Sequence, residues 1–290
     1  RMRRSSVMHS PRMPNPTIVK LGGQLLEDAA LLRRISRRLL KIAATEPLVV
    51  VHGGGQEVNT ELVRLGIPIR RVDGLRLTDA ETLDVVVGVL AGRINTRLVA
   101  ALNAVGGSAI GLTGVDDGLT RIRRLRKYRD TKGNSIDPGF VGHPTGDLHS
   151  ELIRDLCNKR YVPVIASVGA NATGQLFNIN ADSFAGHLAT VLRAKRLIVA
   201  GTTAGVLDAK GRTIPTVDNS TITDLVRNGQ VNAGMVAKLL ACQSARSQGV
   251  SSVSIVDGRA ASFDKTAGTM IEGNTHERTD EWDKTDEHLR

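Results

Sequence analysis

The chain has 290 residues, of which 41% are hydrophobic and 23% are charged, a composition typical of a globular protein with a substantial core. Aromatic residues make up only 2%, so few side chains could stack on bases, which argues against single-stranded nucleic acid as a ligand. The formal net charge is +10, but residues 1–16 and 121–132 carry this whole excess, and the remainder has no basic stripe that would indicate a nucleic-acid partner.

The two ends of the chain differ in composition from its middle. Residues 1–16 contain four Arg, three Pro and no acidic residue, and we expect a disordered basic leader there. Residues 272–290 are acidic and poor in apolar side chains, so we expect a disordered tail. Two isolated cysteines, Cys157 and Cys242, suit neither a disulfide framework nor a metal site, and they indicate a reducing, cytoplasmic location. No apolar run approaches the length of about 20 residues that a membrane span needs, so no membrane association is expected.

Apolar, β-rich runs alternate with amphipathic stretches along residues 17–271. The expected strands are Thr17–Leu21, Leu48–Val51, Ser108–Leu112, Val162–Ala166, Leu197–Ala200 and Ser252–Val256. The expected helices are Leu25–Ala44, Gln56–Leu65, Ala80–Asn103, Asp147–Asn158, Ala181–Leu192 and Met235–Ser247. Two further segments, Arg121–Val141 and Ser167–Phe177, are expected to be β-hairpins. The alternation predicts an α/β fold with an open, mainly parallel sheet sandwiched between helices.

Glycine turns follow the first two expected strands, at Gly22-Gly23 and at Gly53-Gly54-Gly55. In doubly wound sheets, ligands lie beyond the carboxyl ends of the strands. Missing side chains let backbone N–H groups approach an anion there, and the following helix adds the positive end of its dipole. A single Gly-Gly can merely end a strand, but two such turns, one preceded by Lys20, indicate a phosphate site.

The common nucleotide-binding and hydrolase signatures are absent. No G-x-x-x-x-G-K-[ST] occurs, and no G-x-G-x-x-G opens a helix after a strand. No G-x-S-x-G nucleophile motif occurs, and the seven His show no metal-ligand spacing. Any use of ATP must therefore depend on a different arrangement of residues.

Polar residues stand where expected elements begin or end. They are Lys20, Arg76, Asn178, Asp182 and Lys238. Each has an ordinary structural explanation when taken singly, because a strand-end lysine is usually solvated and an aspartate often caps a helix. Their functional interpretation therefore depends on their occurring together.

Six motifs that contain these residues occur in one order. They are Lys20-Leu21-Gly22-Gly23, His52-Gly53-Gly54-Gly55, Asp73-Gly74-Leu75-Arg76, Asn178-Ile179-Asn180-Ala181-Asp182, Gly205-Val206-Leu207-Asp208, and Gly234-Met235 with Lys238. In order and spacing, residues 17 to about 271 resemble the acetylglutamate kinases of the amino-acid kinase superfamily. The resemblance implies the fold of that superfamily, with an N-terminal half that binds the amino acid and a C-terminal half that binds ATP. It also implies ATP-dependent phosphorylation of the side-chain carboxylate of N-acetyl-L-glutamate to N-acetyl-glutamyl 5-phosphate, a step of arginine biosynthesis.

The resemblance further implies roles for individual residues. The catalytic set would be Lys20, Asp182 and Lys238, with both lysines neutralising the transferring phosphoryl group and the aspartate holding them. The substrate-binding set would be Gly54, Gly55, Arg76 and Asn178, with the arginine gripping a carboxylate bidentately. The ATP- and phosphate-binding set would be Gly22, Gly23, Thr202, Gly205 and Gly234. A carboxylate acceptor needs no general base, and Mg²⁺ would be held mainly by ATP, with no protein metal ligand.

The chain departs from the family pattern on the nucleotide side. Thr202 stands where the family usually has an aspartate, which leaves the strength of ATP binding open. Arginine-sensitive members of the family that the chain resembles have an N-terminal helix and a longer segment before the final Gly-Thr. By that resemblance, the leader's prolines and the short segment 258–268 imply a homodimer that is insensitive to arginine. Two alternatives stay open: a kinase for aminoadipate or glutamate held by an acidic carrier protein, which the basic stretch Arg121–Lys127 could dock, and a non-catalytic ligand-sensing homologue.

Overall fold

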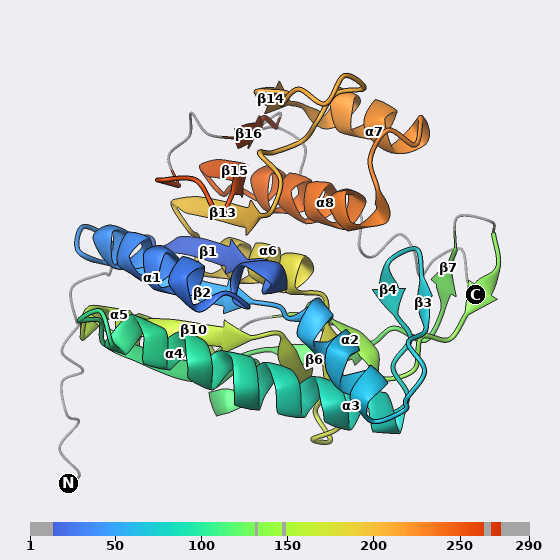
Figure 1. Ribbon diagram of the computed structural model, residues 1–290, viewed down its shortest axis with the longest axis horizontal. Helices are drawn as coiled ribbons and strands as arrows, with labels where there is room; N and C mark the ends of the chain where they lie inside the picture. Colours follow the sequence, from blue (N-terminus) through green and yellow to red (C-terminus); the bar gives the residue numbers. More distant parts are fainter. Residues whose placement is uncertain (1–13, 131–132, 147–148, 264–267, 274–290) are drawn as a thin grey trace, which may run out of the picture.

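The computed structural model describes residues 14–130, 133–146, 149–263 and 268–273. The predicted leader and tail lie outside these residues, apart from 14–16 and 272–273. An eight-stranded sheet forms the centre of the molecule (Figure 1). Its strands, in spatial order, are β14 (Thr216–Val217), β16 (Gly268–Ile271), β15 (Ser252–Asp257), β13 (Arg196–Gly201), β1 (Thr17–Leu21), β2 (Leu48–His52), β10 (Val162–Ala166) and β5 (Ala109–Thr113).

The strands from β15 to β5 all pair in parallel, while β16 runs antiparallel to β15. Every residue of β1, β2 and β10 is buried, as expected for strands covered on both faces. The predicted mainly parallel sheet between helices is confirmed. The short strands β14 and β16 were not predicted.

Helices cover both faces of the sheet. One face carries α5 (Glu151–Asn158), α6 (Ala181–Val191), α7 (Asn219–Arg227) and α8 (Ala233–Ser247). The other face carries α1 (Ala29–Ala43), α2 (Gly55–Arg64), α3 (Ala80–Val87), the π-helix η2 (Gly88–Ile94) and α4 (Asn95–Asn103). Successive strand residues supply the two cores in turn: Val49 and Val51 pack with the first set of helices, and Val50 packs with the second.

Two helix predictions need correction, and one helix was not predicted. The first helix begins at Ala29, not Leu25, because Asp28 caps it by accepting the Leu31 N–H at 2.6 Å, and a short 3₁₀ turn, η1 (Gly23–Leu25), precedes it. Helix α5 begins at Glu151, and residues 147–148 lie outside the described part of the chain. Helix α7 was not predicted.

The expectation that no apolar run is long enough for a membrane span is also wrong. Residues Ala80–Asn103 form one helical run whose mean hydropathy is 1.6, long and apolar enough by composition alone. However, 44% of this window is buried within the protein, and Leu90, Ile94 and Leu98 belong to the second core. We therefore assign α3, η2 and α4 to the core of the domain.

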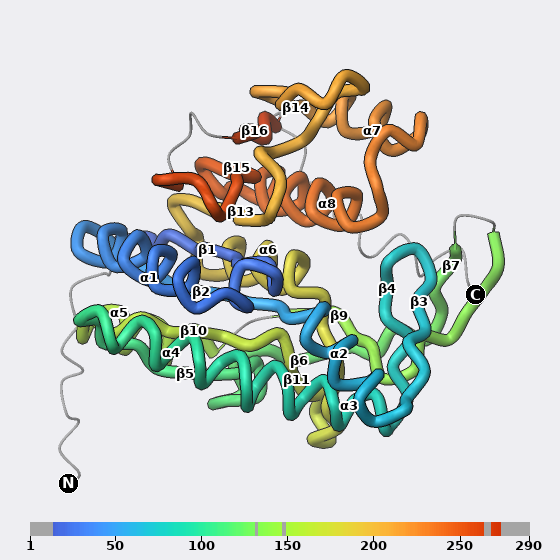
Figure 2. The backbone as a smooth tube through the Cα atoms, viewed as in Figure 1, coloured from blue at the N-terminus to red at the C-terminus, as the bar shows by residue number. Residues whose placement is uncertain are grey.

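Smaller β-structures flank the sheet. A closed barrel contains β6 (Arg121–Arg124), β9 (Val141–Thr145), β11 (Val168–Ala170) and β12 (Leu176–Ile179), and the 3₁₀ turn η3 (Asp116–Gly118) precedes it. The predicted hairpins are confirmed in β11–β12 and in β7 (Tyr128–Arg129) with β8 (Ser135–Ile136). A further hairpin of β3 (Arg71–Val72) and β4 (Leu75–Arg76) turns at Asp73 and Gly74, both at positive φ. The hairpins β3–β4 and β7–β8 lie side by side (Figure 2), joined by a hydrogen bond from the Tyr128 hydroxyl to Asp73 at 3.4 Å.

Candidate active site

The two glycine turns meet at the carboxyl edge of the sheet. The Gly22 N–H donates to the Ala200 carbonyl at 2.9 Å, and the Gly53 N–H donates to the Leu21 carbonyl at 3.3 Å, which ties the turns to neighbouring strands. A Cβ on Gly23 would lie 2.7 Å from the Gly54 Cα, so the backbones touch where only glycine fits. Within the described residues, the N–H groups of Gly23, Gly54 and Gly55 have no acceptor, whereas that of Gly22 is already engaged.

Lys20 and Asp182 form a buried ion pair beside these turns. Lys20, on β1, is 5% exposed, and its Nζ lies 2.8 Å from Asp182 Oδ1. Asp182 stands in the first turn of α6, where the Asn180 side chain caps the helix by accepting the N–H groups of Asp182 and Ser183. The carboxylate is thereby fixed on a helix start, aimed at the centre of the sheet.

Lys238 completes the cluster from the other half of the chain. Its Nζ lies 4.0 Å from Asp182 Oδ2 and donates to the Gly234 carbonyl at 3.1 Å. Burial lowers the pKa of Lys238, and the nearby Lys20 lowers it further, while Asp182 opposes both effects. Two ammonium groups share one carboxylate, which leaves one net positive charge at an edge where helix N-termini also attract anions.

The predicted substrate residues meet on the other side of the glycine turns. Arg76, on β4, is 7% exposed, and its Nη2 donates to the Gly55 carbonyl at 3.0 Å and to Asn59 Oδ1 at 2.6 Å. Asn178, on β12, donates to the Thr78 hydroxyl at 3.2 Å, and that hydroxyl donates to the Arg76 carbonyl at 3.0 Å. Asn59 and Thr78 were not predicted as site residues; Asn59 lies one helical turn after Gly55, and Thr78 lies two positions after Arg76.

The Arg76 guanidinium has a donor that no hydrogen bond in the described part of the chain uses. Its Nη1 is buried without a hydrogen bond, and no carboxylate in the described part of the chain pairs with it. Burial, together with the nearby Arg71, lowers the pKa of Arg76 to about 10, so it remains charged at neutral pH. A buried cation with an unused donor is suited to binding a carboxylate ligand.

Of the residues predicted to bind the nucleotide, Thr202 directly follows β13, Gly205 lies in the loop after it, and Gly234 lies in the first turn of α8. The Thr202 hydroxyl donates to Gln24 Oε1 at 3.1 Å, and its carbonyl accepts from Arg259 Nη2 at 2.5 Å. Arg259 also pairs with Asp257 at 3.0 Å, so the carboxylate of Asp257, on the neighbouring strand β15, is linked to Thr202 through the Arg259 side chain. Gly205 has φ 126° and no room for a Cβ, because Thr269 Oγ1 would lie 2.5 Å away. Polar residues directly after the strand 252–256 were the signal that could have revealed Asp257 and Arg259.

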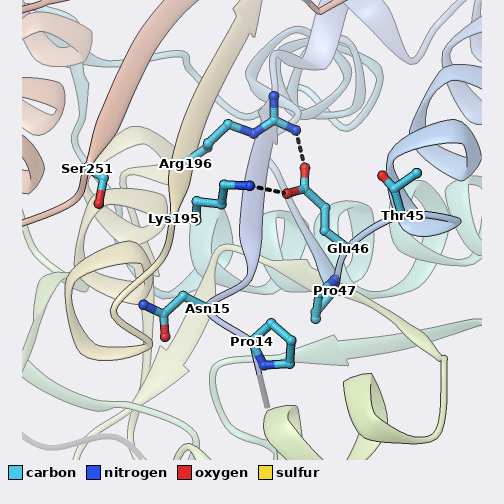
Figure 3. Close-up of a pocket in the computed structure, with 8 residues that line it drawn as sticks. All are labelled: Pro14, Asn15, Thr45, Glu46, Pro47, Lys195, Arg196 and Ser251. Atoms are coloured by element: carbon cyan, nitrogen blue, oxygen red, sulfur yellow. Dashed lines mark hydrogen bonds and ion pairs between the residues drawn. The ribbon is translucent and has the colours of Figure 1, made fainter. Parts of the chain in front are cut away.

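A cavity of about 790 Å³ lies at the opposite edge of the sheet (Figure 3). Its walls are residues that precede or begin the strands, among them Thr45, Glu46 and Arg196. Glu46 pairs there with Arg196 and, at 3.6 Å, with Lys195. None of the predicted site residues lines this cavity, so it is separate from the candidate active site.

Two histidines, the fully buried His52 and the partly buried His187, predict a fall in stability on mild acidification. Burial lowers the pKa of His52 and of His187 from 6.5 to about 4. Between these two pKa values the unfolded chain binds protons that the native protein does not. The unfolding free energy therefore has its full value above about pH 6.5 and falls as the pH is lowered towards 4. We expect a loss of about 2 kcal/mol per histidine between pH 7 and pH 5, measured by urea unfolding. In His187→Asn the drop should halve; an unfolding free energy that is flat over this range would contradict the prediction.

Comparisons with known proteins show which family this chain belongs to. The model of the Amino acid kinase family matches residues 15–257. An acetylglutamate kinase of Stutzerimonas stutzeri is 39% identical over 248 residues, which is 83% of this chain and 82% of that protein. An acetylglutamate kinase of Acidiphilium cryptum is 41% identical with the same coverage. Among solved structures, an N-acetylglutamate synthase from Neisseria gonorrhoeae has a TM-score of 0.77 and 19% identity over 90% of this chain and 60% of that one, which shows a shared fold.

Proposed function

Because the chain belongs to the amino acid kinase family, we propose that it is an acetylglutamate kinase and infer its reaction from its site. It transfers the γ-phosphoryl group of ATP to the side-chain carboxylate of N-acetyl-L-glutamate and serves arginine biosynthesis. The observation that carries the substrate assignment is the buried Arg76 with its unused Nη1 donor. The N-terminal half, including Arg76, would bind the amino acid, and the C-terminal half would bind ATP.

The proposed reaction needs charge neutralisation and no proton transfer. A carboxylate oxygen of the substrate forms a bond to the γ-phosphorus while the bond to the β–γ bridging oxygen breaks, and ADP leaves with that electron pair. Lys20 and Lys238 would stabilise the charge on the transferring group, and Asp182 would keep both ammonium groups in place. Gly23, Gly54 and Gly55 would supply backbone N–H groups, whereas Gly22 would instead fix the turn to β13.

The assignment is tested by trapping the acyl phosphate with hydroxylamine. ATP is supplied in parallel with N-acetyl-L-glutamate, with free glutamate or aminoadipate, and with the same two amino acids bound to a carrier protein, and the hydroxamate is measured. We expect product from N-acetyl-L-glutamate. No product from it at millimolar concentration would refute the assignment, and product from a carrier-bound amino acid alone would favour the carrier-linked alternative. The absence of nucleotide binding in calorimetry would favour a ligand-sensing protein.

Arg76→Lys is expected to raise the KM for N-acetyl-L-glutamate by about 100-fold, because lysine keeps the charge but cannot form two parallel hydrogen bonds to a carboxylate. The KM for ATP should stay within about twofold of the wild-type value. Steady-state kinetics with each substrate varied in turn provide the measurement, and Arg70→Lys on the exposed surface is a matched control. An equal rise in both KM values would show that Arg76 does not act on the amino acid specifically.

Gly23→Ala is expected to lower kcat at least about 10-fold, since displacements of about 1 Å at a reacting centre can cost 100-fold. The added Cβ would lie 2.7 Å from the Gly54 Cα and 3.2 Å from its N and C atoms, and backbone cannot give way as a flexible side chain can. Gly88→Ala is the matched control, because its Cβ would meet nothing within 4 Å. Unchanged kinetics in Gly23→Ala would show that the contact of the turns is dispensable.

We further propose how the metal ion is held, where the protein is located and how it assembles. Mg²⁺ would be held mainly by the phosphates of ATP, where it would offset their charge; in the described part of the chain no group of three or more His, Cys, Asp or Glu gathers, and Asp182 is engaged by two lysines. Two free, buried cysteines are consistent with a cytoplasmic protein.

A homodimer is proposed, to be tested by light scattering. Exposed apolar residues at the end of α2, such as Val63 and Leu65, offer a contact surface.

A further inference from the structure

His52 is a buried side chain that the proposed mechanism does not use. It ends β2, directly before the glycine turn, and is fully buried. Its Nδ1 lies 3.1 Å from the Gly53 carbonyl. A carbonyl can only accept, so Nδ1 carries the proton and Nε2 is left as an acceptor. The imidazole therefore fixes the orientation of the first peptide of the turn.

Asn95 holds the other side of that imidazole. Its Nδ2 lies 3.1 Å from His52 Nε2 and also donates to the Val164 carbonyl at 2.9 Å, which fixes which end of the amide faces the ring. Gly111 leaves the space for this amide, since a Cβ there would lie 2.1 Å from Asn95 Oδ1. With Asn95 donating, Nε2 must stay unprotonated, so the two side chains select one neutral tautomer.

The helical residues before Asn95 pack against the same glycine turn, Gly53-Gly54-Gly55. Asn95 directly follows the π-helix η2, a type of irregularity that is common at functional sites. Leu90 and Ile94 of η2 would lie 2.7 and 2.1 Å from a Cβ on Gly54, so they occupy the space over that glycine. The turn is thus held by a hydrogen bond at Gly53 and by apolar packing at Gly54.

We propose that His52 and Asn95 are positioning residues that set the Gly53 peptide and thereby aim the free N–H groups of Gly54 and Gly55 at the bound amino acid. This inference rests on the proposed function, because it takes N-acetyl-L-glutamate as the ligand of those N–H groups. Neither side chain contacts the reacting atoms. Their effect should therefore appear in substrate binding on the amino-acid side and not in nucleotide binding.

The first test compares His52→Phe with His52→Asn. Phenylalanine keeps a ring but cannot donate to Gly53, whereas the asparagine amide can donate from nearly the position of Nδ1. We expect His52→Phe to raise the KM for N-acetyl-L-glutamate about 10-fold with the KM for ATP within twofold, and His52→Asn to recover most of this loss. Unchanged KM values in a folded His52→Phe protein, or equal losses in both variants, would overturn the inference. A wild-type protein without activity would instead refute the proposed function.

A second test uses the wild-type protein and so does not depend on whether a variant folds. Nitrogen-15 NMR of the His52 ring at pH 7 should show a proton on Nδ1 and none on Nε2. A proton on Nε2 would overturn the inference.

A third test uses Asn95→Leu, which should raise the KM for N-acetyl-L-glutamate. Combining it with His52→Phe should add little, because each change breaks the same pair of hydrogen-bonded side chains. Effects that multiply in the double variant would show that the two residues act separately.

Discussion

Lys238→Ala is expected to lower kcat by about 100- to 1,000-fold, the usual loss when one group that stabilises transition-state charge is removed. The Lys238 ammonium lies 4.0 Å from Asp182 on the edge where the phosphoryl group would be transferred, and its hydrogen bond and ion pair within the described residues join it to neither Arg76 nor Asn178. Affinity for N-acetyl-L-glutamate should therefore stay within about twofold of the wild-type value. Single-turnover kinetics and calorimetry measure the two quantities independently.

The matched control is Lys41→Ala, which removes an exposed lysine from the last turn of α1. It should leave both quantities unchanged. If Lys238→Ala weakened acetylglutamate binding while kcat persisted, the lysine would belong to the substrate site and its assigned role in phosphoryl transfer would be wrong.

Asp182→Asn is expected to damage both catalysis and stability. Lys20 is 5% exposed and lies 2.8 Å from Asp182 Oδ1, so the neutral amide would leave a buried ammonium without its counter-charge. Breaking one side of a buried ion pair typically costs about 3–5 kcal/mol, and we expect a loss of unfolding free energy of that order. We also expect kcat to fall by about 100-fold or more, because both lysines lose their anchor.

Urea unfolding and steady-state kinetics test the two parts of this prediction. Asp28→Asn is the matched control, because asparagine also caps helices well and Asp28 caps α1 without pairing to a lysine. A stable Asp182→Asn protein with full activity would show that the ion pairs are incidental to the site.

The central strands were predictable because their residues are apolar and buried on both faces, so a continuous run such as Val162–Ala166 has few other interpretations. Strands β14 and β16 were not, since two to four residues carry too little pattern and pair only through the tertiary fold. Helix α7 was not predicted because its sequence is largely polar. The π-helical part of the run 80–103 has no sequence signal that distinguishes it from α-helix.

The candidate site residues were predicted from their positions at element ends, and the fold brings Lys20, Asp182 and Lys238 together. Several hydrogen bonds between elements that are distant in sequence could not be predicted. His52 and Asn95 lie 43 residues apart, and Thr202 meets Arg259 across 57 residues. Such contacts leave no local pattern, because each depends on which elements become neighbours. The engaged N–H of Gly22 was hidden for the same reason.

The division of the lysine cluster along the chain has a consequence for synthesis on the ribosome. Lys20, Arg76, Asn178 and Asp182 have all been made before α8 emerges, whereas Lys238 belongs to α8 (Ala233–Ser247). A chain that ends before α8 therefore lacks the second ammonium group, and the proposed phosphoryl-transfer site is complete only once the C-terminal part of the domain has been added.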